Sequence, residues 1–189
     1  MKQFIAIILT AVLLSTSANA AAAGATGAAK ADAPVLSVVA IHHVSIAVPD
    51  LDAAIAWYSK IFGLTIEHRM ETNFGMRGAF LRRPGIRLEL WQSQSLPDTP
   101  EARRAPKQDM KIMGIKHVAF VVPDLRSALA ALLKQGVQLI AVQYDRNEPM
   151  QPDPDPLAPG KRRPFSIFIA DPFGTPIEIL DGAQVGNGV

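Results

Sequence analysis

The sequence predicts an α+β fold made of two tandem βαβββ modules. The first observation is a repeat, because residues 41–60 and 115–134 align at a constant offset of 74 with ten identities in twenty positions. Repeats of this kind usually dictate the architecture of a chain. The second is a weaker echo further along each copy, where residues 80–90 resemble residues 168–179 with one residue inserted. Each copy carries a histidine early and a glutamate late.

The composition limits the class of protein. The chain has 189 residues, of which 49% are hydrophobic and 19% charged, as in a globular protein with a core. The formal net charge is only +2, and no run of Lys and Arg has interleaved aromatics. We therefore expect no nucleic-acid partner. The absence of cysteine excludes disulfides, thiolate metal sites and cysteine nucleophiles.

Residues 1–20 have the pattern of a secretory signal peptide. Lys2 supplies a positive charge, residues 4–14 an apolar stretch, and residues 18–20 an Ala-Asn-Ala cleavage site. The apolar stretch is too short to span a bilayer. The sequence therefore predicts a periplasmic or secreted protein, cleaved after Ala20, with no stable membrane insertion afterwards.

A flexible leader rich in Ala and Gly is expected over residues 21–37, and module one over residues 38–92. The region 35–48 is interpreted as the first strand. Asp50 is a suitable N-cap for the helix that follows, and Gly63 a suitable C-terminal stop. The remaining strands are expected over residues 64–71, 76–83 and 86–92.

A polar linker with three prolines, residues 93–113, leads to module two, residues 114–182. Asp124 and Gly136 bound its helix in the same way as in module one. Its strands are expected over residues 115–122, 137–144, 165–170 and 176–181.

Residues 145–164 form a long segment with six prolines, and residues 183–189 a loose tail. Structureless segments of this length are often lids or binding loops, and a solvated excursion is the alternative. Its Lys161-Arg162-Arg163 cluster could engage an anionic substrate or simply be solvated.

The histidine and glutamate of each copy lie on matching strand faces. In the first strand, His43 shares a face with small residues while bulky ones point the other way, which suggests the floor of a cleft. His117 has the matching place in module two. By the same alternation Glu89 and Glu178 project from apolar strands, where an ionised carboxylate is costly unless it is paired or bound to a metal.

Two histidines and two glutamates at matching positions would meet if the modules pack with pseudo-twofold symmetry. Imidazole and carboxylate ligands suit Zn, Ni, Co, Mn or Fe, and four protein ligands leave room for water or substrate. The predicted metal ligands are His43, Glu89, His117 and Glu178. His42 is expected at the surface, and His68 has no counterpart in module two. Trp91 and Phe80 are interpreted as core residues ahead of pocket residues.

The repeated pattern resembles that of the vicinal oxygen chelate superfamily. This superfamily includes glyoxalase I, methylmalonyl-CoA epimerase, extradiol dioxygenases and fosfomycin-resistance proteins. The resemblance covers residues 38–182. It rests on the paired strand histidines, the Pro-Asp-Leu that opens each helix, and the Asp-Pro-x-Gly-x-x-Ile-Glu segment over residues 171–178. It implies curved mixed sheets around a metal-binding cleft, with the four predicted ligands matching the family's ligand positions one by one. A homodimer is a further expectation from the resemblance.

The resemblance also implies a reaction. A substrate with vicinal oxygens chelates the metal, which stabilises a developing enolate or oxyanion. In the glyoxalase and epimerase branch a glutamate moves a proton next to a carbonyl. The full set of four ligands favours this lyase or isomerase branch, with Glu178 as the first choice of catalytic base and Glu89 the second.

Two alternatives stay open. His43, His117 and Glu178 alone would give the facial triad of a non-haem Fe(II) dioxygenase. The other alternative is a metal-free binding protein that sequesters a drug or other small molecule, in which the four polar residues satisfy one another in ion pairs. Fold resemblance does not choose among the three.

Overall fold

The computed structural model of the chain describes residue 36 and residues 39–92 and 97–185. The expected signal peptide lies outside the described residues, as does all of the expected leader except Leu36. From Ala40 onward the chain forms one unit. No helix in the described ranges has the length and apolar character needed to cross a membrane.

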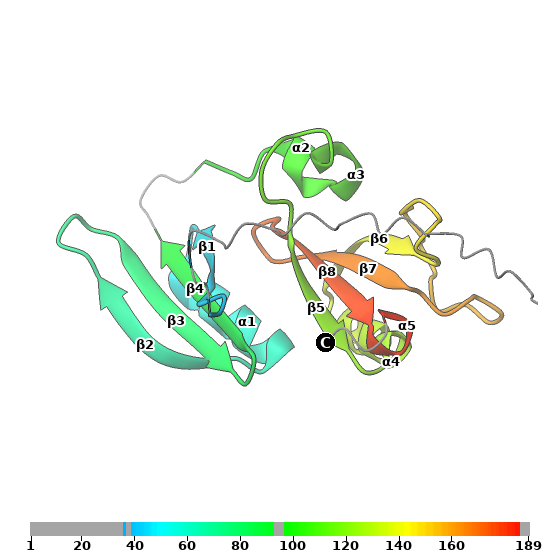
Figure 1. The fold of residues 1–189 in the computed structure, drawn as a ribbon, viewed down its shortest axis with the longest axis horizontal. Helices are drawn as coiled ribbons and strands as arrows, with labels where there is room; N and C mark the ends of the chain where they lie inside the picture. The colour runs from blue at the N-terminus through cyan, green and yellow to red at the C-terminus, as the bar shows by residue number, and fades with distance from the viewer. Residues whose placement is uncertain (1–35, 37–38, 93–96, 186–189) are drawn as a thin grey trace, which may run out of the picture. The chain divides into compact units, whose positions relative to one another are not determined.

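Module one is a four-stranded mixed sheet with one helix against it (Figure 1). Its strand order is β1-β4-β3-β2, with β1 parallel to β4 and the other neighbours antiparallel. Its elements are β1 (Val44–Val48), α1 (Leu51–Phe62), β2 (Thr65–Glu71), β3 (Arg77–Arg83) and β4 (Ile86–Gln92). The fold of this half is therefore βαβββ, as the sequence predicts.

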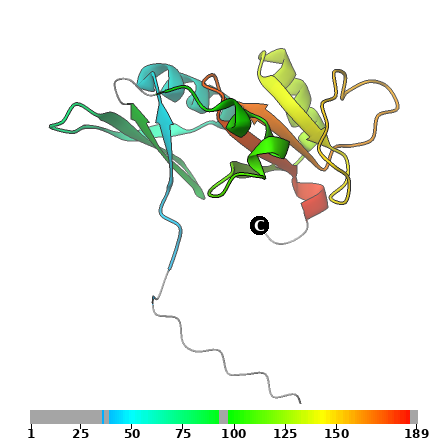
Figure 2. The same ribbon diagram turned by 90° about the horizontal axis from the view of Figure 1, so that it is seen from above.

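Module two repeats this topology, with strand order β5-β8-β7-β6 and β5 parallel to β8. Its elements are β5 (Val118–Val122), α4 (Leu125–Lys134), β6 (Gln138–Gln143), β7 (Ser166–Ala170) and β8 (Pro176–Asp181). The strands of the two modules form two separate four-stranded sheets. Figure 2 shows one long helix beside each sheet, α1 and α4.

Both long helices begin and end where the sequence predicts. The Asp50 carboxylate accepts a hydrogen bond from the Ala53 backbone N–H at 3.0 Å, and Asp124 caps α4 through the N–H of Arg126. These side chains satisfy backbone donors that a helix leaves free at its N-terminus. Gly63 ends α1 in the left-handed conformation, with φ at 66°, which glycine adopts without strain.

Two boundaries differ from the prediction. The first strand is shorter than the predicted region 35–48, because residues 39–43 are not part of a strand and pairing with β4 begins at Val44. In module two, pairing likewise begins at Val118, so His43 and His117 each directly precede a strand. An apolar run can continue into a strand only while a partner strand lies beside it, and partners are set by tertiary structure.

The linker and the tail hold short helices that the sequence patterns do not predict. These are α2 (Glu101–Arg104), α3 (Pro106–Asp109) and α5 (Gly182–Val185). Each is a single turn, too short to show helical periodicity. The buried carboxylate of Asp109 fixes the linker by contacts with Arg103 and Lys116.

The modules share one hydrophobic core, formed by the helix-covered faces of both sheets. Phe62 at the end of α1 lies against Phe120 of β5, with ring centroids 4.6 Å apart. Tyr58, fully buried on α1, donates a hydrogen bond of 3.0 Å to the buried carboxylate of Asp171. Burial raises the pKa of Tyr58 well above its usual value, and the neighbouring Asp171 carboxylate raises it further, so the phenol stays protonated and donates.

Ion pairs between its own charged residues hold the segment 145–164 in place, so it is not a freely solvated loop. Arg162 makes a two-point contact with Glu148, and Lys161 contacts Asp153 at 2.7 Å. Arg126 of α4 donates to backbone carbonyls of the segment. The basic cluster is therefore engaged with carboxylates of the protein, which argues against its use on an anionic substrate.

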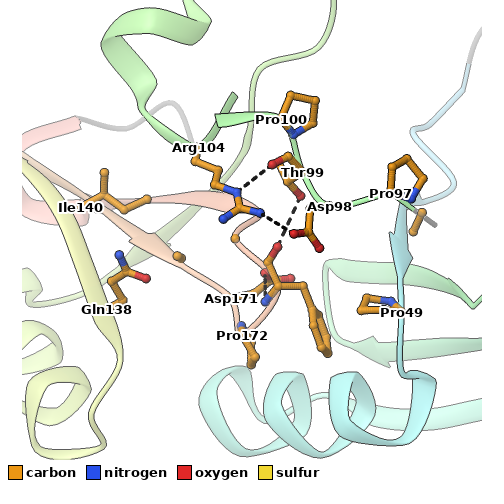
Figure 3. Close-up of a pocket in the computed structure, with 14 residues that line it drawn as sticks. Pro49, Pro97, Asp98, Thr99, Pro100, Arg104, Gln138, Ile140, Asp171 and Pro172 are labelled. Carbon is orange, nitrogen blue, oxygen red and sulfur yellow. Dashed lines mark hydrogen bonds and ion pairs between the residues drawn. The ribbon is translucent and has the colours of Figure 1, made fainter. Parts of the chain in front are cut away.

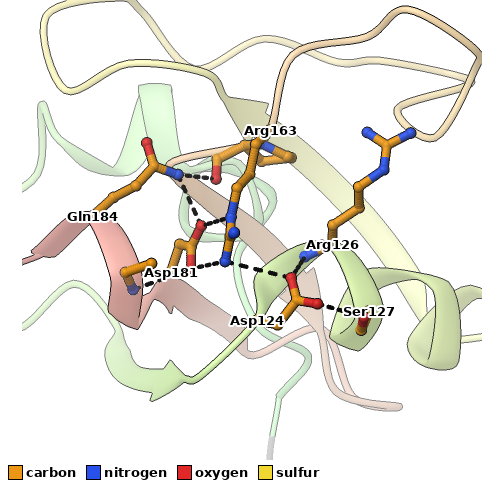
Figure 4. A network of polar contacts seen from close by, with 8 residues as sticks. Asp124, Arg126, Ser127, Arg163, Asp181 and Gln184 are labelled. Atoms are coloured by element: carbon orange, nitrogen blue, oxygen red, sulfur yellow. Dashed lines mark hydrogen bonds and ion pairs between the residues drawn. The ribbon is translucent and has the colours of Figure 1, made fainter.

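Arg163 is the anchor at the end of this segment (Figure 4). Its guanidinium binds both oxygens of Asp181, the fully buried last residue of β8, and lies 3.4 Å from Asp124 at the start of α4. Burial alone raises the pKa of Asp181, but hydrogen bonds from Arg163 and Gln184 outweigh it, so the net pKa is lowered.

Replacement of Tyr58 by phenylalanine tests the contact between the modules. The variant Tyr58→Phe keeps the ring but leaves one oxygen of the Asp171 carboxylate without its donor, and we expect a loss of about 1–3 kcal/mol in the free energy of unfolding. Urea denaturation followed by circular dichroism measures it. Unchanged stability would show that this hydrogen bond contributes nothing net.

The ion pair of Arg163 and Asp181 predicts a pH dependence of stability. Because the pKa of Asp181 is lowered in the folded state, its contribution is present at neutral pH and is lost as the pH falls through the folded pKa. We expect Arg163→Met to lose about 1–2 kcal/mol at pH 7, after allowance for the partly exposed guanidinium. The difference from the unmodified protein should shrink as the pH falls below about 4, the ordinary pKa of an aspartate.

The control for this prediction is Arg162→Met, which removes the same charge from a pair exposed to solvent. It should change stability less than Arg163→Met, because water screens exposed ion pairs. A deficit of Arg163→Met that stays constant down to pH 2 would contradict the linkage to Asp181.

Candidate metal-binding half-sites

The four predicted ligands come together as two pairs, one on each sheet. His43 Nε2 lies 3.3 Å from Glu89 Oε2, and His117 Nε2 lies 3.0 Å from Glu178 Oε2. We call these half-site one and half-site two. Among the described residues, no three or more His, Asp or Glu side chains are gathered so that they could hold a metal ion. The pairing within each module is therefore present, and the meeting of all four residues is not found in the single chain.

The strand register explains why each pair forms. Ser45 pairs with Glu89 across β1 and β4, and Ala119 pairs with Glu178 across β5 and β8. Residues two apart on a strand point to the same face, so a histidine two residues before each of these positions has its ring beside the glutamate. The histidine and the glutamate of each module therefore lie on the same face of the sheet, as the alternation of residues in the sequence predicts.

Each half-site lies on an aromatic ring from the neighbouring strand. Phe80 of β3 stands opposite Glu89, and Phe168 of β7 stands opposite Glu178. The His43 ring meets Phe80 edge to face at 5.2 Å, and the His117 ring meets Phe168 at 5.0 Å. Such packing restricts the imidazole rings and leaves their Nε2 atoms directed at the carboxylates.

The face that carries the half-sites is accessible in the single chain. His43 and His117 have side chains 31% and 26% exposed, and the glutamates 13% and 16%. The neighbouring strand residues Ser45, Ala47 and Ala119 are exposed, whereas the opposite faces of both sheets lie in the shared core. The half-sites can therefore meet a ligand or another protein surface without unfolding.

Trp91 forms an apolar wall beside half-site one. It follows Glu89 on the same face of β4 and pairs with Gly78 of β3. A Cβ atom at position 78 would lie 2.7 Å from Cε3 of Trp91, closer than side-chain carbons approach. Gly78 thus lets the indole lie across the backbone of β3. The interpretation of Trp91 as core is wrong in this respect, since it is only partly buried; Phe80 is buried at 8% exposure, as expected.

Two histidines outside the predicted set also lie near half-site one. His42, expected at the surface, is exposed but contacts both His43 and Arg87. His68 of β2 packs against Phe80, with ring centroids 4.9 Å apart. The adjacent His-His sequence is the one signal that could have drawn attention to His42.

A pocket of about 730 Å³ opens beside the turn that precedes β8 (Figure 3). Its wall includes Asp171, whose carboxylate accepts backbone hydrogen bonds from Phe173 and Thr175, and Arg104, which donates to the Thr99 carbonyl at 2.7 Å. None of the four predicted ligands lines it. Asp171 and Arg104 are engaged in holding the turn and the linker, and the pocket lies apart from the half-sites.

The family follows from comparison with known proteins. A sequence model of the Glyoxalase/Bleomycin resistance protein/Dioxygenase superfamily matches residues 42–151. The chain therefore belongs to this superfamily, the vicinal oxygen chelate group that the repeated motifs resemble. Its members are often metal-dependent enzymes.

About three quarters of the chain aligns with most of the length of its relatives, and the solved structures among them share its fold. The uncharacterized protein YaeR of Escherichia coli (strain K12) is 26% identical over 78% of this chain and 99% of its own. A glyoxalase family protein from Enterococcus faecalis has a similar structure, with a TM-score of 0.54 and 24% identity over 75% of this chain and 97% of its own. The trypanothione-dependent glyoxalase I of Leishmania major gives a TM-score of 0.52 and 21% identity, over 76% of this chain and 86% of its own.

Substitution of Gly78 tests the placement of Trp91. We expect Gly78→Ala to displace the indole and to cost about 1–3 kcal/mol in the free energy of unfolding, as overpacking does. Near-UV circular dichroism should show the change in the tryptophan environment. At the matching pair of module two, Ser166, which has a Cβ atom, lies opposite leucine, Leu180. The double variant Gly78→Ala, Trp91→Leu imitates this pair and should recover most of the stability. No recovery would contradict the contact.

Proposed function

We propose that the protein is an exported, metal-dependent lyase or isomerase of the glyoxalase-like type. Its substrate is a small molecule with two neighbouring oxygens, and the reaction transfers a proton next to a carbonyl. The observation that carries the proposal is the pair of His–Glu half-sites at matching strand positions of the two modules. Membership in the superfamily supports it.

The donor atoms of the half-sites suit a divalent cation. Each half-site presents an imidazole nitrogen and a carboxylate oxygen, which Zn, Ni, Co, Mn and Fe(II) all accept. Two donors are too few, however, because catalytic sites use about three or four protein ligands. The complete set therefore needs half-site one and half-site two to face each other.

A second copy of the chain can supply the missing half. The helix-covered faces of the two modules are already packed in a common core, whereas the faces that carry the half-sites are accessible. In a symmetric dimer, half-site one of one subunit would meet half-site two of its partner, and twofold symmetry would produce two such sites. We therefore propose that the site closes between two chains and not within one.

The four predicted ligands and Trp91 have distinct roles in the proposed reaction. A cation held by His43, Glu89, His117 and Glu178 would act as a Lewis acid on the substrate's two oxygens. Glu178 takes the proton from the carbon next to the carbonyl and returns it to the product. We assign this role to Glu178 before Glu89, because Glu89 has Arg87 two residues away on its face, and Glu178 has the small, uncharged Pro176 in the corresponding place. Trp91 supplies an apolar surface for the rest of the substrate.

A metal-free binding protein is the second candidate. The observation in its favour is that each histidine contacts its own glutamate, as that hypothesis predicts. The same contact is expected of an unloaded metal ligand pair. Metal content therefore separates the two candidates.

Elemental analysis of the mature protein, purified without chelator, is the first test. We expect about one equivalent of Ni, Zn, Co or Mn per chain, lost in His117→Ala and kept in His68→Ala, which removes a histidine outside the half-sites. Predominant iron would favour the dioxygenase and ring cleavage of catechols. No metal in the unmodified protein, even after loading, would favour the binding protein and contradict the catalytic proposal.

Mixing two inactive variants tests whether the site forms between subunits. His43→Ala and His117→Ala each damage every site, but a mixed dimer has one site with both substitutions and one intact site. After subunit exchange we expect cobalt binding at about a quarter of the unmodified level, because half of the dimers are mixed and each regains one of two sites. A site within one chain would give no recovery.

Export is proposed from the signal-peptide pattern of residues 1–20 alone. Mass spectrometry of the protein recovered from a bacterial periplasmic extract should give a chain that begins at Ala21. A full-length chain confined to the cytoplasm would contradict the proposal. Its failure would leave the half-sites unaffected.

A further inference from the structure

Two arginines face each other across the hairpin of β3 and β4, next to its turn. Arg82 and Arg87 are direct partners in the strand register, so their side chains lie on the same face of the sheet. This is the accessible face, which also carries Glu89. Like charges directly opposite each other destabilise a sheet. Features that local structure disfavours are expected at functional sites, so this pair is a candidate for one.

A single carboxylate lies beside the two arginines. β2 has a bulge between Ile66 and His68, and Glu67 is the extra residue of this bulge. Arg87 Nε donates to one oxygen of Glu67 at 2.7 Å, whereas the other oxygen is 3.7 Å from Arg82 Nη1, beyond hydrogen-bond distance. The hydrogen bond from Arg87 lowers the pKa of Glu67, so this carboxylate is ionised at neutral pH. One negative charge thus offsets only one of the two positive charges.

The two guanidiniums differ in how firmly they are held. Cζ of Arg87 lies 3.9 Å from the centroid of the Phe80 ring, a cation–π contact, and its side chain is 23% exposed. The side chain of Arg82 is 61% exposed and extends into solvent. A guanidinium presents a planar fork of N–H donors that matches two oxygens of a carboxylate or phosphate. The pair therefore offers one fixed and one solvent-facing binding group for an anion.

An open pocket of about 470 Å³ lies at these side chains. Its wall includes Glu67, Arg82, Arg87 and also Arg83. Arg83 donates to the backbone carbonyl of Phe62 at 2.8 Å, a neutral acceptor that leaves its charge in place. Three guanidiniums and one carboxylate thus line a pocket with room for a small molecule.

Module two shows that the fold does not need these charges. It has the same bulge in β6, where Ile140 is the extra residue, and the same strand pair, where Ala170 faces Pro176. These three uncharged residues take the places of Glu67, Arg82 and Arg87. Because the same backbone forms with them, the charged trio of module one is not a requirement of the βαβββ unit.

We propose that Arg82 and Arg87 form an anion-binding site, which takes a carboxylate or phosphate group of a small molecule. The anion lies between the two guanidiniums, where it offsets the repulsion of the facing charges and accepts hydrogen bonds from Arg82. The site uses none of the four predicted metal ligands. It therefore stands whether or not the half-sites hold a cation.

Nitrogen-15 NMR of the arginine side chains, with inorganic phosphate and acetate added in separate titrations, tests this site. The ionic strength is kept constant, because added salt would screen the charges. We expect saturable shifts of the Nε–H signals of Arg82 and Arg87 with at least one of the two anions, and the tighter anion identifies the ligand class. Arg87→Met should weaken the binding about 10-fold, since it removes a charged hydrogen-bond donor.

Glu67→Gln should have the opposite effect. It keeps the size of the side chain and an acceptor for Arg87, but it removes the negative charge that competes with an added anion. We expect about 5-fold tighter binding, the size of one charge interaction at about 4 Å in water. A purely structural role of the two arginines predicts no gain in affinity from this variant.

Arg77→Met is the matched control. Arg69 and Arg77 also share one carboxylate, that of Asp52, at 2.8 and 3.2 Å, so both are within reach of it. The variant removes the same charge from module one and should change anion affinity by less than about 2-fold, since exposed charges are screened. Two results would overturn the proposal: no saturable shift in either the unmodified protein or Glu67→Gln, or equal shifts at Arg69 and Arg77.

Discussion

The buried carboxylate of Asp171 is the interaction on which the placement of half-site two depends. One of its oxygens accepts the N–H groups of Phe173 and Thr175 and so forms the turn that leads into β8. The other accepts the hydroxyl of Tyr58 from the helix of module one. A carboxylate that is 3% exposed must have such partners to be tolerated. The same group thus shapes the strand that carries Glu178 and joins that strand to module one.

The shared core and the half-sites lie on opposite faces of each sheet, so one fold carries both a hydrophobic core and two accessible His–Glu pairs. Leu88 and Leu90 of β4 are buried under α1, while Arg87, Glu89 and Trp91 alternate with them on the accessible face. The core provides stability through apolar burial. The accessible face is free to carry polar ligands, and the proposed dimer would cover it.

The duplicated halves have diverged in the environment of their ligands rather than in the ligands themselves. Half-site one has His42, Arg87 and Trp91 beside it, and half-site two has Lys116, Pro176 and Leu180 at the corresponding positions. The two half-sites are nevertheless exposed to a similar extent, with the histidine side chains at 31% and 26%.

The sequence by itself determined the repeat, both βαβββ units, the helix caps at Asp50 and Asp124, and the strand faces on which the glutamates lie. These features depend on the alternation of neighbouring residues and on short-range hydrogen bonds, which can be inferred from one sequence. Only the tertiary structure decided that β1 starts at Val44, that Trp91 lies over Gly78, and that His42 and Arg87 meet. It also decided which sheet faces pack together and left the half-sites apart, because these contacts join residues distant in sequence whose meeting depends on packing.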